Sequence, residues 1–447
     1  MNLEVPKEAK EIFQKFRKKG FEIYLVGGAV RDLLLGRPTE DLDFTTNAKP
    51  EEILQLFPNG FYDNVFGTVG VPIKGKVFEI TTFRSESGYS DRRHPDKIKW
   101  GKTLEEDLKR RDFTINAMAL DPKGKITDLF GGQEDLRKKL IRCVGNPEER
   151  FREDALRLIR AVRIATQLRF VIEEKTFLAI KKNANLIKDI SGERIRDELF
   201  KILRSDYPAD GFQLLFNCGL LDQIIPELAQ CFGVAQAKHH KFDVFKHSIE
   251  SLRHCPSKDP IVRFATLIHD IGKPPTAQGV GENRTFYNHE VVGASIARNI
   301  AQRLAFSKKD REKLVTLVRW HQFTVDEHQT DRAIRRFIRR VGKENLKDII
   351  DLRIGDRLGG GCLSATSWRL RLFMKRLIEV QKQPFSVKDL KVNGHDVMRI
   401  LKIGPGPKVG EVLQTLFEEV EEDMTKNKRS YLLKRIKDFA KAEGRKV

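Results

Sequence analysis

Hydrophobic and polar positions follow two different patterns along the chain. Up to about residue 140, short segments rich in β-branched and aromatic residues alternate with helical ones. Residues 24–26 read as a buried strand, and residues 67–73 and 76–83 read as a hairpin joined by Lys74 and Gly75. Beyond residue 140 helical spacing dominates. The pattern predicts an α+β fold, in which a small mixed sheet is followed by helices.

A chain of 447 residues is too long to form a single core. We expect four parts: a head over residues 1–140, a helical neck over 141–205, a helical body over 206–385 and a helical tail over 386–447. In the tail, His395 and Asp396 follow Asn-Gly in a turn, and we interpret them as a helix cap.

A glycine pair and two carboxylates dominate the head. Residues 27–47 read GGAVRDLLLGRPTEDLDFTTN. Gly27 and Gly28 precede a predicted helix and leave room for phosphate beside its first N–H groups. Asp41 and Asp43 flank Leu42 in a predicted strand, where residues two apart share a face. Two carboxylates on one face are suited to hold one Mg²⁺.

A ladder of charges marks the neck. Residues 148–170 predict one helix, with Asp154, Arg157, Arg160 and Arg163 at steps of three. Its other faces are nearly all apolar, which favours a cleft for these charges over a surface laced with ion pairs. Steps of three drift by roughly 60° each, so Arg163 lies nearly opposite Asp154. Asp154 and Arg157 can therefore act together.

In the body, histidines and aspartates recur in the order His247, His269-Asp270, His289, His321, Asp356. This order resembles the HD phosphohydrolase superfamily. The resemblance implies ligands for one or two divalent metals, and neutral imidazoles with carboxylates suit Ni²⁺, Mn²⁺, Fe²⁺ or Zn²⁺ better than Mg²⁺. A capped core histidine is the alternative for any single one of them. The expected ligands are His247, His269, Asp270 and Asp356, with His289 and His321 as further candidates.

The head motif and the segment RRDFTINA at residues 110–117 together resemble the signature of the class II tRNA nucleotidyltransferase and poly(A) polymerase family. The resemblance implies a polymerase-β-like nucleotidyltransferase head. It also implies Glu79 as a third catalytic carboxylate beside Asp41 and Asp43. Gly28, Arg31 and Arg111 are expected to bind the triphosphate, because a planar guanidinium fits phosphate oxygens.

The resemblance extends into the neck, where residues 153–157 match the family's E-D-x-x-R motif. In that family the motif acts as an amino-acid template for the incoming base. Asp154 and Arg157 are accordingly expected to select the base. Arg160 and Arg163 are expected to bind phosphate or to brace Asp154. Residues 193–199 resemble the segment that closes the family's neck.

The resemblance implies the template-independent addition of CCA to the 3′ end of tRNA from CTP and ATP, with release of pyrophosphate. A CC-adding enzyme is disfavoured by the long loop at residues 85–95, and a poly(A) polymerase by the form of residues 66–69. An A-adding enzyme that works beside a CC-adding one stays open. The rival of another class is an HD phosphohydrolase that acts on RNA ends.

The charge of the chain favours a polyanionic partner. Lysine and arginine number 83 against 63 acidic residues, a net charge of +20 with a pI near 9.6. A surface merely enriched in Lys and Glu is the alternative. By resemblance the basic tail would hold the tRNA elbow, while head and neck hold its 3′ end.

The cysteine spacing and the apolar runs bear on the cellular location of the protein. The five cysteines lack C-x-x-C spacing, which disfavours a zinc ribbon and a disulfide framework. No apolar run of about 18 residues predicts a transmembrane helix, and the N-terminus lacks the core of a signal peptide. We expect a cytoplasmic protein that does not act at a membrane.

Overall fold

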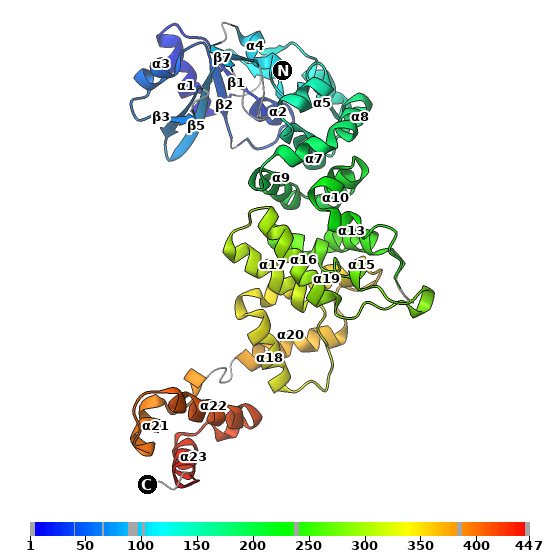
Figure 1. Ribbon diagram of the computed structural model, residues 1–447. Coiled ribbons are helices and arrows are strands. Elements are labelled where there is room, and N and C mark those ends of the chain that lie inside the picture. The colour runs from blue at the N-terminus through cyan, green and yellow to red at the C-terminus, as the bar shows by residue number, and fades with distance from the viewer. Residues whose placement is uncertain are drawn as a thin grey trace.

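The computed structural model describes residues 5–39, 41–64, 67–87, 97–100, 103–236, 241–381 and 387–442. Figure 1 shows a head that contains the sheet at one end, helical layers in the middle and a small helical unit at the other end. The predicted α+β fold with a small mixed sheet is confirmed. No helix in these ranges is long and apolar enough to cross a membrane.

The head is built on a sheet whose order, over the described strands, is β3-β4-β5-β2-β1-β8-β9. β2 and β5 are parallel and the other neighbours are antiparallel. The predicted hairpin is β4–β5, and its turn residues Lys74 and Gly75 have positive φ. The strands are β1 (Ile23–Val26), β2 (Asp43–Thr46), β3 (Phe61–Asn64), β4 (Thr68–Ile73), β5 (Lys76–Thr82), β8 (Met118–Leu120) and β9 (Ile126–Asp128).

Short helices fix this sheet in place. Helix α1 (Lys7–Lys18) buries Ile12, Phe13 and Phe16, and Phe13 packs edge-to-face on Phe44 of β2 at 5.6 Å between ring centroids. That contact anchors the strand that begins with Asp43. The other head elements are α2 (Gly28–Leu34), α3 (Pro50–Leu56), β6 (Arg84–Ser87), β7 (Lys97–Trp100), α4 (Leu104–Lys109) and α5 (Gly132–Lys138).

The neck differs from its prediction at Asp154. The helix expected over residues 148–170 is two helices, α6 (Pro147–Glu153) and α7 (Leu156–Leu168). Asp154 between them is extended, with φ −141° and ψ 104°, and its Oδ1 accepts a hydrogen bond from the Leu156 amide at 3.0 Å. An aspartate that bonds a nearby backbone N–H competes with helix continuation. The single-helix prediction is therefore wrong, and Asp154 stands outside the helix that carries the three arginines.

The rest of the neck and the body are helical. Helix α9 begins after Ser191, whose side chain makes no capping hydrogen bond. The larger helices are α8 (Glu174–Asn183), α9 (Gly192–Arg204), α10 (Pro208–Asn217), α13 (Val244–His254), α14 (Pro260–Ile268), α16 (His289–Arg303), α17 (Lys308–Trp320), α18 (Asp331–Val341), α19 (Leu346–Gly359) and α20 (Trp368–Gln381).

The tail has a core of its own. One continuous set of buried apolar residues runs through head, neck and body, while residues 390–440 form a separate set. The tail helices are α21 (Gly394–Leu401), α22 (Pro407–Glu422) and α23 (Arg429–Ala442). Asn393 and Asp396 form a reciprocal capping box, which confirms the cap interpretation. The buried Arg335 of α18 donates to the Glu421 backbone carbonyl at 2.8 Å, and Arg339 pairs with the Glu421 carboxylate at 2.9 Å, so a hydrogen bond and an ion pair join tail and body.

Candidate functional site

The head carboxylates gather at the start of β2. Asp43 is the first residue of that strand, whereas Asp41 precedes the strand and is exposed. The prediction that both lie on the strand is therefore wrong for Asp41. Glu79 of β5 is the direct parallel partner of Asp43, so both side chains project from the same face. The structure thus brings the expected third carboxylate beside Asp43 from a strand 36 residues away.

Gly27 shapes the space beside Asp43. Its φ is +73°, a conformation that favours glycine. A Cβ at this position would lie 3.2 Å from Nη1 of Arg111 and 3.7 Å from Oδ2 of Asp43. The bare backbone of Gly27 therefore faces one cation and one carboxylate, next to the first turn of α2.

The negative charges of Asp41 and Asp43 lie close enough together to favour a bound cation. Burial and the neighbouring charge of Asp41 raise the pKa of Asp43, against the opposing charges of Arg111 and Arg160. A carboxylate that resists ionisation for these reasons gains most from a bound cation. Oxygen donors of this kind fit a hard divalent ion.

Asp107 holds the two arginines of the RRD segment. Its fully buried carboxylate pairs with Arg110 at 2.6 Å and Arg111 at 3.1 Å. Burial acts to raise the pKa of Asp107, but the two arginine charges outweigh it and lower the pKa. The sequence reasoning missed this residue. Its spacing of three and four residues ahead of the arginines, on a helix, is the signal that could have found it.

A chain of polar contacts continues from α2 into the neck. Arg31 donates to Asn116 Oδ1 at 2.8 Å and pairs with Asp32 at 2.8 Å. Asn116 in turn donates to Asp112 at 3.1 Å, and Asp112 pairs with Arg160 of α7 at 2.6 Å. Asp112 and Asn116 therefore link the head to the neck.

The expected base-reading residues have separate partners here. Arg157 is buried and donates to Glu153 Oε2 at 2.8 Å and to the carbonyls of Arg150 and Arg110. Asp154 lies 3.6 Å from Arg194 of α9. The α6–α7 break thus points the two side chains to different neighbours.

The outer arginines of the ladder are also engaged. Arg163 pairs with the buried Glu198 of α9 at 2.6 Å, and Arg160 pairs with Asp112. Neither Arg160 nor Arg163 forms an ion pair with Asp154, which instead pairs with Arg194. Sequence reasoning marked residues 193–199 as a segment but did not pair its members with the ladder.

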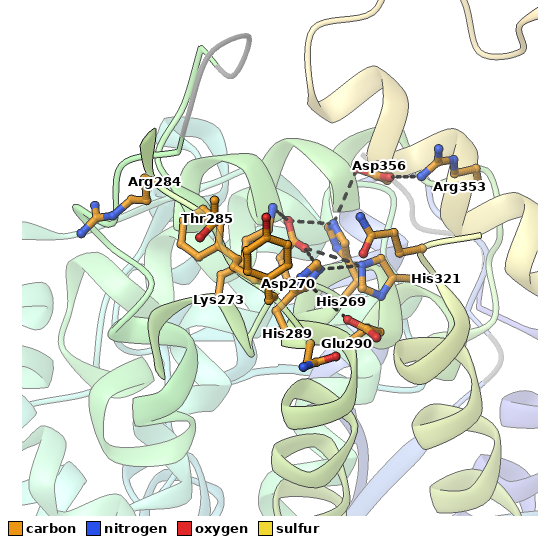
Figure 2. Close-up of a pocket in the computed structure, with 14 residues that line it drawn as sticks. His269, Asp270, Lys273, Arg284, Thr285, His289, Glu290, His321, Arg353 and Asp356 are labelled. Carbon is orange, nitrogen blue, oxygen red and sulfur yellow. Dashed lines mark hydrogen bonds and ion pairs between the residues drawn. The ribbon is translucent and has the colours of Figure 1, made fainter. Parts of the chain in front are cut away.

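The body holds the second cluster (Figure 2). Asp270 lies at its centre, within 3.5 Å of His247 through Oδ2 and within 3.6 Å of His321 through Oδ1. Among the residues the structure describes, two groups of three side chains could each hold a metal ion. One group is His247, His269 and Asp270, and the other is Asp270, His289 and His321. Asp356 adds a carboxylate oxygen 3.2 Å from His247.

Backbone carbonyls orient these imidazoles. Nδ1 of His269, His289 and His321 each lies 2.7 to 2.8 Å from the carbonyl of a residue three positions earlier. A hydrogen bond between Nδ1 and a carbonyl leaves Nε2 of each ring directed at the cluster, which is the arrangement that metal sites use. The ring orientation therefore fits a metal centre rather than isolated core histidines.

Charge in this cluster is high and buried. Burial acts to lower the pKa of His269, but Asp270 and Asp356 raise it to about 10. Lys273 pairs with Asp270 at 2.6 Å. The cluster opens into a pocket of about 570 Å³ lined also by Arg284, Tyr287 and Arg353. Anionic groups on a substrate would find cations around the histidines.

Fold and sites together define a protein that joins a polymerase-type nucleotidyltransferase head to an HD domain. Family models agree: a poly A polymerase head domain matches residues 23–142, a probable RNA and SrmB-binding site of polymerase A matches 169–232, and an HD domain matches 240–358. The head and the neck thus resemble the tRNA nucleotidyltransferase/poly(A) polymerase family, and the body carries an HD domain.

The curated relatives of this chain include CCA-adding enzymes. The CCA-adding enzyme of Ligilactobacillus salivarius is 55% identical over 208 residues, which cover 46% of this chain and 52% of that protein. The CCA-adding enzyme of Geobacillus stearothermophilus is 47% identical over 223 residues, 50% of this chain and 55% of that protein. The chain thus spans about half the length of the curated relatives it matches.

Solved structures match over nearly the whole length. The Bacillus stearothermophilus CCA-adding enzyme in complex with CTP has a TM-score of 0.73 at 29% identity and covers 98% of both chains. The Thermotoga maritima enzyme complexed with tRNA has a TM-score of 0.61 at 21% identity, which shows the shared fold.

Proposed function

We propose that the protein adds CCA to the 3′ end of tRNA without a nucleic-acid template, using CTP and ATP. The observation that carries this proposal is the meeting of Asp43, Glu79, Gly27 and Arg111 at the start of β2. The named relatives are CCA-adding enzymes, which supports the same substrate class.

In this reaction the tRNA 3′-oxygen attacks the α-phosphorus, the bond to the β-phosphate breaks and pyrophosphate leaves. Asp41, Asp43 and Glu79 would hold Mg²⁺, whose chemistry when bound is to activate the 3′-hydroxyl and stabilise the leaving pyrophosphate. Arg111, oriented by Asp107, would bind the triphosphate near Gly28 and Arg31.

Base selection would fall to Asp154 and Arg157. Arg157 is buried against Glu153 and two carbonyls, so reading a base requires the α6–α7 junction to reorient when a nucleotide binds. Arg160 and Arg163, which are paired with Asp112 and Glu198, would support that junction rather than contact the base.

An extension assay distinguishes the family's activities. It uses three transcripts of one tRNA, which end in the discriminator base, in C or in CC. With CTP and ATP, each should be extended to CCA. Extension of the CC-ended transcript alone, with no use of CTP, would support the A-adding alternative instead. Long runs of A would support a poly(A) polymerase. The distinguishing loop at residues 85–95 lies partly outside the described residues.

A second activity is supported by the two histidine groups around Asp270. We infer a metal-dependent phosphohydrolase that acts on phosphomonoesters or cyclic phosphodiesters, with Ni²⁺ or Mn²⁺ at the ligands. Hydrolysis of nucleoside monophosphates and 2′,3′-cyclic phosphates by wild-type protein, lost in Asp270→Ala, is the test. No hydrolysis with any of these ions would count against it.

Action on tRNA would also fit the expected cytoplasmic location and a tail that binds the tRNA elbow. Both of these stay predictions.

A further inference from the structure

A second basic pocket lies at the junction of head and neck. It measures about 400 Å³ and is lined by α2, by the C-terminal ends of α7 and α9, and by the residues that follow α2 and α9. Figure 1 shows α2 beside the sheet, with α7 and α9 below it. Its charged lining residues are Arg31, Arg37, Lys201 and Arg204, with Asp32 and Asp206.

The pocket keeps an excess of positive charge after its ion pairs are counted. Arg31 is paired with Asp32 at 2.8 Å, and Lys201 with Glu198 at 3.1 Å. In the described part of the chain, neither Arg37 nor Arg204 has a carboxylate within 4.0 Å, and both are exposed. The lining carboxylate Asp206 lies 3.8 Å from Lys258. Arg37 donates one hydrogen bond of 3.4 Å to the Gln167 carbonyl and Arg204 lies over the Phe200 ring, so both guanidinium groups keep further N–H donors for a ligand.

The lining identifies the ligand's chemistry. Besides the charged residues it contains Gln167, Leu168 and Ser205, and no aromatic ring on which a base could stack. Paired guanidinium forks suit phosphate oxygens. A phosphodiester, which is read by its charge rather than by its base, fits this lining.

The position of Arg31 relates the pocket to the transfer site. Its Nη2 would lie 3.3 Å from a Cβ placed at Gly28, so Arg31 separates the phosphate loop from the pocket. The nucleotide side of that loop faces Arg111 and Asp43 instead. The pocket therefore begins where the space for the incoming nucleotide ends.

We propose that this pocket binds a backbone phosphate of the RNA strand whose 3′ end is extended. Arg37 and Arg204 supply the contacts, and Arg31 is shared with the transfer site. The proposal rests on the proposed function, and it names a contact that positions the RNA strand rather than one that selects a base.

Helix stability offers another role for one of these residues. Arg204 lies in the last turn of α9, where a cation interacts favourably with the helix dipole and stabilises the helix. That role predicts a lower melting temperature without any change in RNA affinity. RNA affinity and its salt dependence therefore separate the two roles.

The test is the double variant Arg37→Ala, Arg204→Ala. Affinity for a tRNA that ends in CC is measured by fluorescence anisotropy at several salt concentrations, and KM for tRNA and for ATP by incorporation. We expect tRNA binding to weaken about tenfold to a hundredfold at 0.15 M salt. The plot of the logarithm of the tRNA association constant against the logarithm of salt concentration should become shallower by about 1 to 2. KM for ATP should stay unchanged.

Two matched variants complete the design. Lys175→Ala with Lys181→Ala removes the same charge from exposed positions of α8 that do not line the pocket, and should leave the salt slope unchanged. Arg37→Lys with Arg204→Lys keeps the charge and should restore most of the slope. Melting curves confirm that each variant is folded.

An unchanged tRNA affinity and slope in the folded double alanine variant would overturn the proposal. So would a rise in KM for ATP alone, because it would assign the pocket to the nucleotide. If the wild-type protein extended no tRNA, the proposed function would fail, yet the anisotropy comparison would still decide the pocket.

Discussion

The carboxylates of the head and the histidines of the body are both candidate metal ligands, yet they are built differently. In the head, Asp41 is exposed before β2, and Glu79 reaches the site from another strand. In the body, His247, His269 and Asp270 are each at most 3% exposed and already lie within hydrogen-bonding range of one another.

The difference indicates two modes of metal use. An open carboxylate site fits an ion that arrives with a nucleotide and leaves with pyrophosphate. A buried site with carbonyl-oriented imidazoles fits an ion that stays bound. Separate variants of the two sites should therefore affect one function each, and the following experiments would break or sharpen that contrast.

The largest effect is expected from Asp43→Asn. Loss of a metal-binding charge should lower nucleotide incorporation about 1000-fold, which equals about 4 kcal/mol of transition-state stabilisation. The metal content of the body, measured by mass spectrometry of the purified protein, should not change. Asp270→Asn should do the reverse. A common loss in both variants would mean that the two sites are coupled.

Two glycines test how rigidly each site is built. At Gly272 a Cβ would lie 2.0 Å from the carbonyl oxygen of His289, so Gly272→Ala should cost about 4 kcal/mol of unfolding free energy and disturb the histidine cluster. At Gly27 the nearest atom is in the Arg111 guanidinium, 3.2 Å away, and the cost of about 1–3 kcal/mol comes mainly from the positive φ of Gly27.

Denaturant unfolding and incorporation rates check this pair. Gly27→Ala should lose mainly activity, because the new methyl group crowds Arg111 and Asp43. Equal losses of stability in both variants would contradict the contrast between a backbone clash and a side-chain contact.

The link between head and neck should contribute less. Arg160→Ala leaves Asp112 buried without its ion-pair partner and should cost about 3 kcal/mol, near the lower end for buried pairs because the Arg160 side chain is 33% exposed. The measurement is urea unfolding at pH 7. A cost below about 1 kcal/mol would mean that water replaces the arginine.

The same pair predicts a pH dependence. Burial acts to raise the pKa of Asp112, but Arg160 outweighs it and lowers the pKa. A lowered folded pKa gives stability that is complete above the unfolded value of about 3.9 and is lost as the pH falls through the folded value. The difference between wild type and Arg160→Ala should therefore be largest near neutral pH and shrink in acid. A difference that grew in acid would contradict this assignment.

Chelation should have the smallest effect on the folded protein. After dialysis against EDTA, Mg²⁺ alone should restore incorporation, while the melting temperature stays a few degrees low until Mn²⁺ or Ni²⁺ is added. An ion at 100 times its Kd adds about 2.7 kcal/mol to stability. Full recovery of the melting temperature with Mg²⁺ alone would mean that the body site prefers hard oxygen chemistry.

Local features of both sites could be predicted from the sequence, because they depend on residues close together in the chain. The β4–β5 hairpin follows from its turn residues, the cap at Asn393 from its neighbours, and the candidate ligands from motif spacing. The break at Asp154 was missed, because apolar periodicity continues across it and the aspartate's bond to the Leu156 amide overrides it.

Only the tertiary structure decided which distant groups meet. The parallel register of β2 and β5 puts Glu79 beside Asp43, and helix packing gives Arg160 to Asp112 and Arg163 to Glu198. Periodicity tells which face of an element is buried, but not which residue of another element lies opposite. That pairing depends on strand register and on how helices pack, since these set the distances between charges that are far apart in the sequence.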